Sequence, residues 1–134
     1  MAGYSKTPLV KKLGIKEGFR VYIVHPPDNY GSLLGSMPDG VAEKERLEDG
    51  LDFVHLFTAS RAELVTFLPA AKEALRPDGM IWISWPKKAA KVATDVTEDV
   101  IREVCLPLDL VDVKVCAVDE IWSGLKLVIR KEKR

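Results

Sequence analysis

The side chains that could bind a ligand or move a proton follow apolar runs of this 134-residue sequence. An imidazole titrates near neutral pH, lysines attract anions, and aromatic rings stack on flat groups. Residues of these types stand after, or at the end of, the apolar runs 19–24, 52–57 and 80–85. We therefore predict a small-molecule or anion site formed by His25, Tyr30, Thr58, Ser84, Trp85, Lys87 and Lys88.

The spacing of these residues does not indicate a catalytic centre. No cysteine or serine nucleophile is tied to His25 by a motif, and no glycine elbow surrounds Ser84. His55 stands in the middle of an apolar run, which is typical of a core or interface position. We predict no catalytic residue, and the sequence favours a binding protein over an enzyme.

Cysteine and histidine usage gives no metal-binding pattern. Cys105 and Cys116 do not form a closely spaced pair, and the two histidines are far apart in the chain. We predict no metal site, and we expect both cysteines to be small buried apolar side chains in a reducing cytoplasm.

A turn near the end of the sequence carries a candidate contact for another protein. Trp122 lies in this turn, and an exposed aromatic side chain often anchors a partner. Asp119 and Glu120 precede it and are expected to face water.

The elements that would position these residues alternate between strands and helices. Thr7 as N-cap and Pro8 as the first helical residue predict a short helix that Gly14 ends. The apolar runs at 19–25, 52–57 and 80–85 predict buried strands. Ser60 with Glu63 forms a capping box for a helix that Pro69 should bend. Residues 76–79 should form the turn that stops it.

The remaining segments predict a second helix and a closing hairpin. The helix begins near Asp95 or near Thr97, and the strands cover 111–117 and 125–130. In the first of these strands Val111, Val113, Val115 and Ala117 alternate with Asp112 and Lys114, which predicts one wetter face. Residues 26–50 are rich in turn formers and ambiguous, with a short edge strand favoured at 41–47.

This order predicts an α/β fold with three layers: a mixed, mostly parallel Rossmann-like sheet that ends in a C-terminal antiparallel hairpin. Strands separated by helices pair in parallel through right-handed crossovers. Ligands bind such sheets at the carboxyl ends of the parallel strands, so the candidate residues should meet at one rim. The length predicts a single domain over residues 1–134.

Composition excludes some classes of partner. Twenty basic and twenty acidic residues cancel, which argues against a nucleic-acid binder, although local patches of charge could still matter. No apolar run approaches the ~20 residues of a membrane span. We predict no nucleic acid and no membrane, and self-association is left open.

Three segments resemble the class I S-adenosylmethionine-dependent methyltransferases. Residues 13–24 are similar to their lead-in and first strand, Leu75-Arg76-Pro77-Asp78-Gly79 resembles their leucine–proline–glycine turn, and the last two strands resemble their reversed pair. The resemblance implies a glycine-rich loop after the first strand and an acidic residue after the second. His25-Pro26-Pro27 stands in place of that loop, and Glu43 or Glu45 is only a nominee for the acid. We predict no cofactor.

The chain also resembles a family of small uncharacterised bacterial proteins. The matching stretches are Tyr4-Ser5-Lys6-Thr7-Pro8-Leu9, Ser60-Arg61-Ala62-Glu63-Leu64, Ile83-Ser84-Trp85-Pro86-Lys87 and Trp122-Ser123-Gly124-Leu125-Lys126. This resemblance implies no activity.

Three hypotheses for the function follow. The first is a non-catalytic small-molecule- or protein-binding protein on a degenerate methyltransferase-like scaffold. The alternatives are a diverged S-adenosylmethionine-dependent methyltransferase, and a protein-interaction subunit that acts through its C-terminal edge hairpin.

Overall fold

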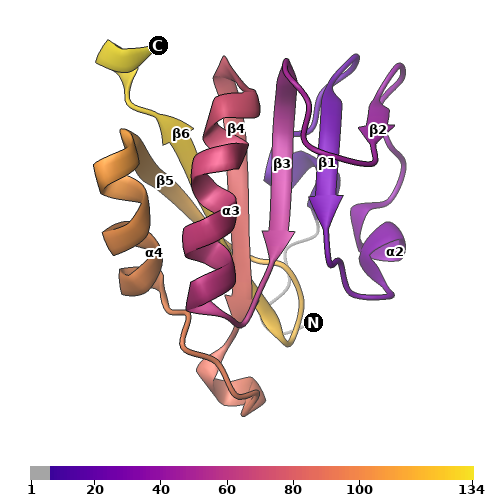
Figure 1. Cartoon of the computed structure of the whole chain (residues 1–134). Helices are drawn as coiled ribbons and strands as arrows, with labels where there is room; N and C mark the ends of the chain where they lie inside the picture. Colours follow the sequence, from indigo (N-terminus) through magenta and orange to yellow (C-terminus); the bar gives the residue numbers. More distant parts are fainter. Residues whose placement is uncertain (1–6) are drawn as a thin grey trace.

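The computed structural model describes residues 7–134, and its central element is one six-stranded sheet. The strand order is β2-β1-β3-β4-β6-β5 (Figure 1). The strands are β1 (Arg20–Val24), β2 (Ala42–Lys44), β3 (Leu51–Phe57), β4 (Leu75–Pro86), β5 (Leu110–Ala117) and β6 (Trp122–Ile129). Pairs among β2, β1, β3 and β4 are parallel, whereas β6 is antiparallel to both neighbours. The predicted mixed sheet with its closing hairpin is confirmed. The matching stretch at Tyr4-Ser5-Lys6 lies outside the described residues.

Helices cover both faces of the sheet, which accounts for the apolar character of the central strands. On one face α3 (Arg61–Ala74) and α4 (Glu98–Cys105) pack against the side chains of β3, β4 and β6 (Figure 1). On the other face α1 (Leu9–Leu13) and α2 (Tyr30–Leu34) pack against a smaller apolar cluster around Phe53 and Trp82. Short 3-10 helices η1 (Lys88–Ala90), η2 (Leu106–Leu108) and η3 (Lys131–Lys133) complete the elements.

Two helix starts follow from capping side chains. The Ser60 hydroxyl accepts a hydrogen bond from the Glu63 N–H at 3.2 Å, as the capping box predicts. The Thr97 hydroxyl accepts from the Val100 N–H, so α4 begins after Thr97 rather than near Asp95. The Asp95 carboxylate instead accepts from the backbone N–H of Arg61 at the start of α3.

Two boundaries differ from the sequence expectation. The first helix has Pro8 rather than Thr7 as its N-cap, and Leu9 is its first helical residue. Residues 76–79 are not a turn before a strand but a wide bulge within β4, since Leu51 pairs with Leu75 and Phe53 pairs with Met80. Four residues of β4 therefore stand opposite one residue of β3, Asp52.

The outer strand β5 buries other residues than expected. Val113 and Val115 are 54% and 49% exposed, whereas Leu110 and Cys116 are buried. The register shifts between Asp112 and Lys114, so Val113 is the extra residue of a bulge. The alternation expected from the valines was wrong because β5 lies at the sheet edge and the bulge interrupts its period.

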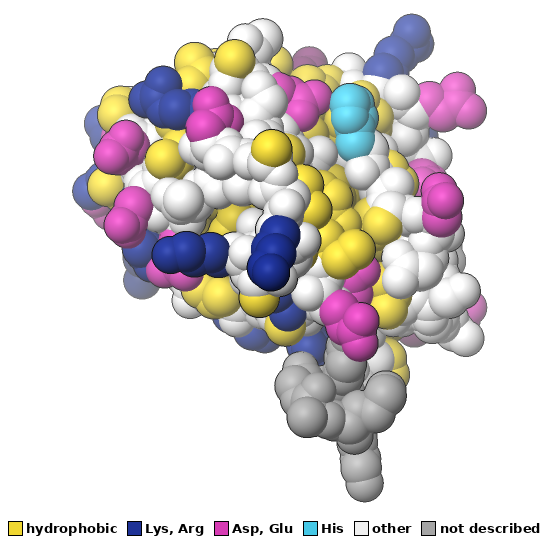
Figure 2. Space-filling view, turned by 90° about the horizontal axis from the view of Figure 1, so that it is seen from below, with side chains coloured by type: hydrophobic (Ala, Val, Ile, Leu, Met, Phe, Trp, Pro, Cys, Tyr) yellow, Lys and Arg dark blue, Asp and Glu magenta, His cyan; other side chains and the backbone are white. Residues whose placement is uncertain are grey.

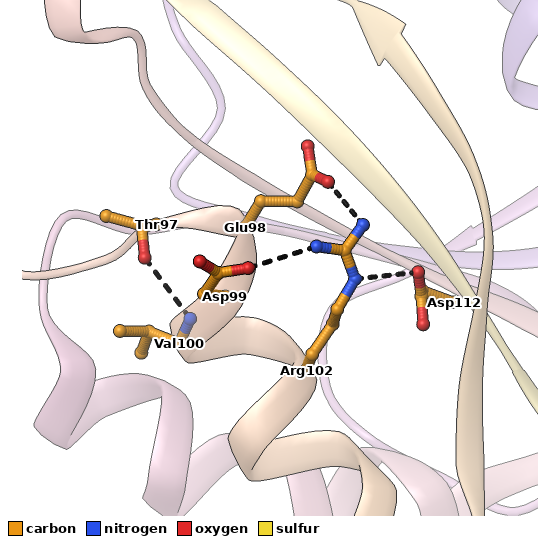
Figure 3. Close-up of polar contacts among 6 residues, drawn as sticks. All are labelled: Thr97, Glu98, Asp99, Val100, Arg102 and Asp112. Atoms are coloured by element: carbon orange, nitrogen blue, oxygen red, sulfur yellow. Dashed lines mark hydrogen bonds and ion pairs between the residues drawn. The ribbon is translucent and has the colours of Figure 1, made fainter.

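An arginine on α4 fastens this helix to β5. The Arg102 guanidinium donates to the Asp112 carboxylate at 2.9 Å and also contacts Glu98 and Asp99 (Figure 3). The hydrogen bond to Asp112 is the main reason that the pKa of Arg102 is raised.

In residues 7–134 we found no helix with the length and apolar character that a membrane span requires. Within the same residues, no group of three or more histidine, cysteine, aspartate or glutamate side chains could hold a metal ion.

Candidate functional site

The carboxyl ends of β1, β3 and β4 lie at the same rim of the sheet. The chain leaves β1 for β2 on one side and returns to β3 on the other, and ligands of open α/β sheets bind where the direction of winding changes in this way. Figure 2 shows this end of the molecule, with hydrophobic side chains gathered in the middle and charged side chains around them.

His25 follows β1 directly and has a left-handed backbone, with φ of 57°. Few non-glycine residues adopt this conformation, and such strain is often found at functional sites. The side chain is exposed, and its Nδ1 atom lies 3.8 Å from Oε2 of Glu63 on α3. The prolines at 26 and 27 offer no N–H donor beside it.

Thr58 joins the ends of β3, β4 and α3. Its hydroxyl donates to the Glu63 carboxylate and accepts from the Ser60 N–H at 3.1 Å. Its own N–H donates to the Ser84 carbonyl at 3.0 Å. Glu63 thus contacts both Thr58 and His25, and the loop after β1 is connected to the start of α3.

A second polar group is buried behind this rim. Nδ1 of His55 lies 2.8 Å from the Tyr30 hydroxyl, and Nε2 lies 2.7 Å from the Ser84 hydroxyl. The ring of Phe57 stacks on the imidazole with centroids 4.1 Å apart. We call Tyr30, His55 and Ser84 the buried polar chain.

Burial fixes the protonation of the buried polar chain. His55 has no exposed surface, and desolvation lowers its pKa to about 3. The pKa of Tyr30 is raised, first by burial and then by the charge of Glu43. His55 is therefore neutral at pH 7, with one nitrogen donating and the other accepting, and each hydroxyl can play the complementary role.

In the buried polar chain, Ser84 and His55 are spaced like a catalytic nucleophile and its base, but a substrate cannot reach them. A serine hydroxyl 2.7 Å from an imidazole nitrogen matches an activated nucleophile. However, Ser84 is completely buried, and the other nitrogen of His55 contacts a tyrosine instead of a carboxylate. These contacts satisfy buried polar groups, which is a structural role.

The seven predicted ligand-binding residues divide into separate groups. His25 and Thr58 meet through Glu63, and Tyr30 and Ser84 meet through His55. Trp85 is buried in the apolar cluster beneath α3 and α4.

The two predicted lysines lie in the loop after β4. The backbone N–H of Lys87 donates to the Ile121 carbonyl at 2.7 Å, and exposed Lys88 begins η1. Trp122, the predicted partner contact, is half-buried and packs edge-on against Phe57, with centroids 5.2 Å apart.

A pocket of about 490 Å³ lies beside His25, between the carboxyl ends of β1 and β2. It is lined by Tyr22, Ile23, Val24, His25, Glu43, Lys44 and Glu45. A neighbouring pocket of about 460 Å³ is lined by Pro26, Pro27, Tyr30 and again Glu43, among others. Glu43 thus lies between the two pockets. We call the pocket beside His25 the rim pocket.

The sequence names His25 and Tyr30 as candidate ligand contacts, but it gives Glu43 and Glu45 only as nominees for an acidic position. Glu43 belongs to a strand of three residues, and so short a strand has little periodicity. From the sequence, Glu63 is expected only as part of the capping box of α3. Its contacts with His25 and Thr58 depend on residues distant in the chain, and no local signal marks them.

Comparison with known proteins gives matches only at the level of structure. No protein-family model and no curated protein matches the sequence. A solved S-adenosylmethionine-dependent methyltransferase from Aquifex aeolicus matches with a TM-score of 0.58 and 16% identity, over 90% of this chain and 87% of that one. Fibrillarin from Aeropyrum pernix, solved with natively bound S-adenosyl-L-methionine, matches with a TM-score of 0.56 and 16% identity, over 90% and 72%. The chain has the methyltransferase fold.

Other solved structures with this fold carry different descriptions. Magnesium protoporphyrin IX methyltransferase from Synechocystis, with bound S-adenosylmethionine, matches with a TM-score of 0.59 and 10% identity, over 92% of this chain and 76% of that one. A protein from Bordetella parapertussis, described as a possible exported protein, matches with a TM-score of 0.61 and 12% identity, over 90% and 65%. At these identities the comparisons establish the methyltransferase fold and leave the activity to be argued from the site.

Proposed function

We propose that this chain binds a small polar molecule in the rim pocket and does not transfer a methyl group to or from it. Glu43 and Glu45 accept hydrogen bonds from hydroxyl or amino groups of the ligand, and His25 contacts it from the end of β1. The observation that carries this proposal is the position of the rim pocket at the carboxyl ends of adjacent parallel strands, lined by both carboxylates.

The charges around the rim pocket support this ligand chemistry. Within residues 7–134, neither Glu43 nor Glu45 lies within ion-pair distance of a basic side chain, although Lys44 also lines the pocket. Both glutamates are exposed and can accept hydrogen bonds from a ligand. The negative charge of Glu43 also raises the pKa of Tyr30, so Glu43 interacts electrostatically with the end of the buried polar chain.

The loop after β1 supports binding without methyl transfer. A cofactor held at the end of β1 would meet His25 in a strained conformation and two prolines without N–H groups. In the described part of the chain, the serine closest to an imidazole is Ser84, which no ligand at the rim can reach while it is buried.

A second candidate function is a diverged methyltransferase. Two observations favour it: the fold, and the position of Glu43 in β2 and of Glu45 directly after it, near where the resemblance places an acidic residue for the ribose hydroxyls. In this reading the same carboxylates would bind the ribose of S-adenosylmethionine, with fewer backbone contacts from residues 25–27.

The two candidates are separated by calorimetric titration and a turnover assay. Adenosine, ribose 5-phosphate, S-adenosylhomocysteine and S-adenosylmethionine are the probes for binding. Saturable binding of a hydroxyl-bearing probe, lost in Glu43→Gln and Glu45→Gln and without formation of S-adenosylhomocysteine, is the expected result. Conversion of S-adenosylmethionine to S-adenosylhomocysteine with an added acceptor would establish the second candidate instead.

A matched control uses a glutamate away from the rim. Glu103 is exposed on α4, on the far side of the sheet from α2, and Glu103→Gln should leave binding unchanged. If Glu43→Gln and Glu45→Gln bind every probe as tightly as the unaltered chain does, the rim pocket is not the site.

The remaining expectations stay predictions. They are the single domain over residues 1–134, a place in a family of small bacterial proteins, a cytoplasmic location, and contact with other proteins through Trp122 or through the β5–β6 hairpin. A native mass measurement would detect self-association.

A further inference from the structure

A cluster of lysines lies on the face of the sheet that carries α1, away from the rim pocket. Lys114 on β5 and Lys126 on β6 are direct cross-strand partners, so their side chains leave the sheet side by side. Like charges placed directly opposite each other destabilise an antiparallel pair. Lys12 on α1 and Lys16 just after α1 approach the same place. We call Lys12, Lys16, Lys114 and Lys126 the lysine cluster.

The fold holds the lysine cluster in place through the backbone. The Lys12 ammonium donates to the Ala117 carbonyl on β5 at 3.2 Å, and the Lys114 ammonium donates to the Lys12 carbonyl at 3.2 Å. Each ammonium has three donors, so both retain donors for another group. These reciprocal contacts tie the end of α1 to β5 and fix two of the charges.

The four charges are not balanced within the described part of the chain. In residues 7–134 none of these lysines lies within ion-pair distance of a carboxylate, although the whole sequence has equal numbers of acidic and basic residues. Burial, together with the charges of Lys114 and Lys16, lowers the pKa of Lys126. The repulsion among these side chains would be relieved by an anion.

Charge and shape limit what could bind there. A second copy of this chain meeting the same face would place lysines against lysines, which disfavours a symmetric dimer. The lysines gather around one cross-strand pair instead of forming a long stripe, and an extended nucleic acid requires a track of charges along its backbone. A compact anion with several negative charges therefore suits the cluster better than either of these partners.

We propose that the lysine cluster is a binding site for a polyphosphate group, either as free inorganic polyphosphate or as the di- or triphosphate of a nucleotide. Lys126 and Lys114 contact the phosphate oxygens from β6 and β5, and Lys16 and Lys12 contact them from the α1 side. The site is separate from the rim pocket and does not depend on the function proposed for it.

Calorimetric titration with inorganic tripolyphosphate and with ATP tests this site. Saturable binding with one site per chain is expected, and removing two charges in the double variant Lys114→Gln/Lys126→Gln should weaken it by roughly tenfold or more. Similar affinities for tripolyphosphate and ATP would show that only the phosphate groups are recognised. A higher affinity for ATP would show that the site prefers a nucleotide. Either result supports the site.

A matched control removes the same charge elsewhere. Lys131→Gln/Lys133→Gln alters two exposed lysines of η3 and should leave both affinities unchanged. The proposal is overturned if tripolyphosphate does not bind, or if both double variants weaken it equally. It is also overturned if a single-stranded oligonucleotide binds with an affinity that rises steadily with its length, which would indicate a nucleic-acid track.

Thermal unfolding at low salt gives an independent measurement. Without an anion, Lys114→Gln/Lys126→Gln should melt at or above the temperature of the unaltered chain, because removal of the like-charge pair offsets the loss of the exposed Lys114 contact with the Lys12 carbonyl. With tripolyphosphate the unaltered chain should gain thermal stability and the double variant should gain little. The proposal would be contradicted if the double variant melted at a lower temperature than the unaltered chain without tripolyphosphate and its melting temperature rose by the same amount when tripolyphosphate was added.

Discussion

At the scale of single residues, the buried polar chain joins three separate segments of the sequence inside an otherwise apolar cluster. Tyr30 comes from α2, His55 from β3 and Ser84 from β4, and all three are buried. Polar groups buried in this way require partners, because an unpaired one costs about 1–3 kcal/mol. No buried side-chain nitrogen or oxygen in the described residues lacks a partner. The hydrogen bond between Tyr30 and His55 therefore connects α2 to β3, beside the apolar contacts of Leu34.

The low pKa of His55 predicts a pH-dependent stability. The unfolded chain binds a proton at His55 below its ordinary pKa of 6.5, whereas the folded chain does so only near 3. Between these values the unfolded state holds more protons, so stability is greatest above pH 6.5 and falls as the pH drops towards 3. The slope from this residue approaches about 1.4 kcal/mol per pH unit. Urea unfolding at pH 7, 6, 5 and 4 measures it.

Two variants isolate the contribution of His55. In His55→Gln the difference in stability from the unaltered chain should shrink as the pH falls, because the variant lacks the titrating ring. Phe57→Leu removes the stacked neighbour but keeps the imidazole, so it should lose stability at every pH with the slope retained. Parallel pH curves for His55→Gln and the unaltered chain would contradict this account.

Ser84→Ala should destabilise the chain by about 1–3 kcal/mol, since it leaves Nε2 of His55 without its partner in a buried site. Ser123→Ala is the matched control. Ser123 is half-buried in the adjacent ladder position of β6, and its loss should change stability by no more than about 0.5 kcal/mol. Equal effects of the two substitutions in urea unfolding would show that the hydrogen bond to His55 does not matter.

Single residues also show where sequence reasoning ends. The burial of His55 could be predicted because its neighbours on β3 are apolar. Its two partners could not be predicted, because they approach only after three distant segments pack together. Likewise Thr58 and His25 were recognisable by type, whereas the connection between them through Glu63 depends on the three-dimensional arrangement.

At the scale of elements, capping explains the position of α4 and side-chain contacts explain how it is held. Thr97 provides the cap, and Arg102 connects the helix to Asp112 on β5 (Figure 3). The sequence predicts that α4 begins near Asp95 or near Thr97. In the structure it begins after Thr97, because the Asp95 carboxylate accepts a hydrogen bond at the N-terminus of α3. The local sequence offers both Asp95 and Thr97 as N-caps. It does not show that the Asp95 carboxylate is already occupied by the backbone N–H of Arg61 in α3.

Thr97→Ala should cost about 1 kcal/mol of stability, because the Val100 N–H loses its acceptor. Thr66→Ala is a matched control in the middle of α3, where the Thr66 hydroxyl donates to the Ala62 carbonyl and alanine is the better helix former. The control should be neutral or slightly stabilising. Chemical denaturation of the two variants checks the prediction, and Thr97→Ala should have the lower denaturant midpoint. A midpoint for Thr97→Ala at or above that for Thr66→Ala would contradict it.

The irregular elements were the least predictable. The bulge at residues 76–79 and the bulge at Val113 both depend on the pairing of one strand with another, and the sequence of a single strand does not encode that register. The helix α2 is only five residues long and lies among turn formers, so its hydrophobic pattern is too short to distinguish it from a loop.

At the scale of the whole molecule, the central strands of the sheet are the most buried from solvent. The strands β3 and β4 have neighbours on both sides and apolar clusters on both faces, whereas β2 consists of three residues at an edge. This overall order was predictable because long apolar runs separated by capped helices specify parallel crossovers. The fold could therefore be predicted, although the ligand cannot be inferred from it.

Amide hydrogen exchange should follow this gradient. The amides of β3 should exchange near the rate of global unfolding, and those of β2 should exchange much faster, because an edge strand can open locally. Mass spectrometry of peptides covering 42–44 and 51–57 measures the difference, with rates corrected for intrinsic exchange. Equal protection of the two strands would mean that β2 opens only when the whole sheet does.

The position of β6 has a consequence for how the protein is made. Although β6 follows β5 in the chain, it lies between β4 and β5. While the ribosome is still adding residues 122–129, β5 has no partner and the outer edge of β4 is open, so the nascent chain presents unpaired backbone groups. A premature stop codon within this segment would leave both edges exposed, and the product should aggregate rather than persist as a slightly shortened fold.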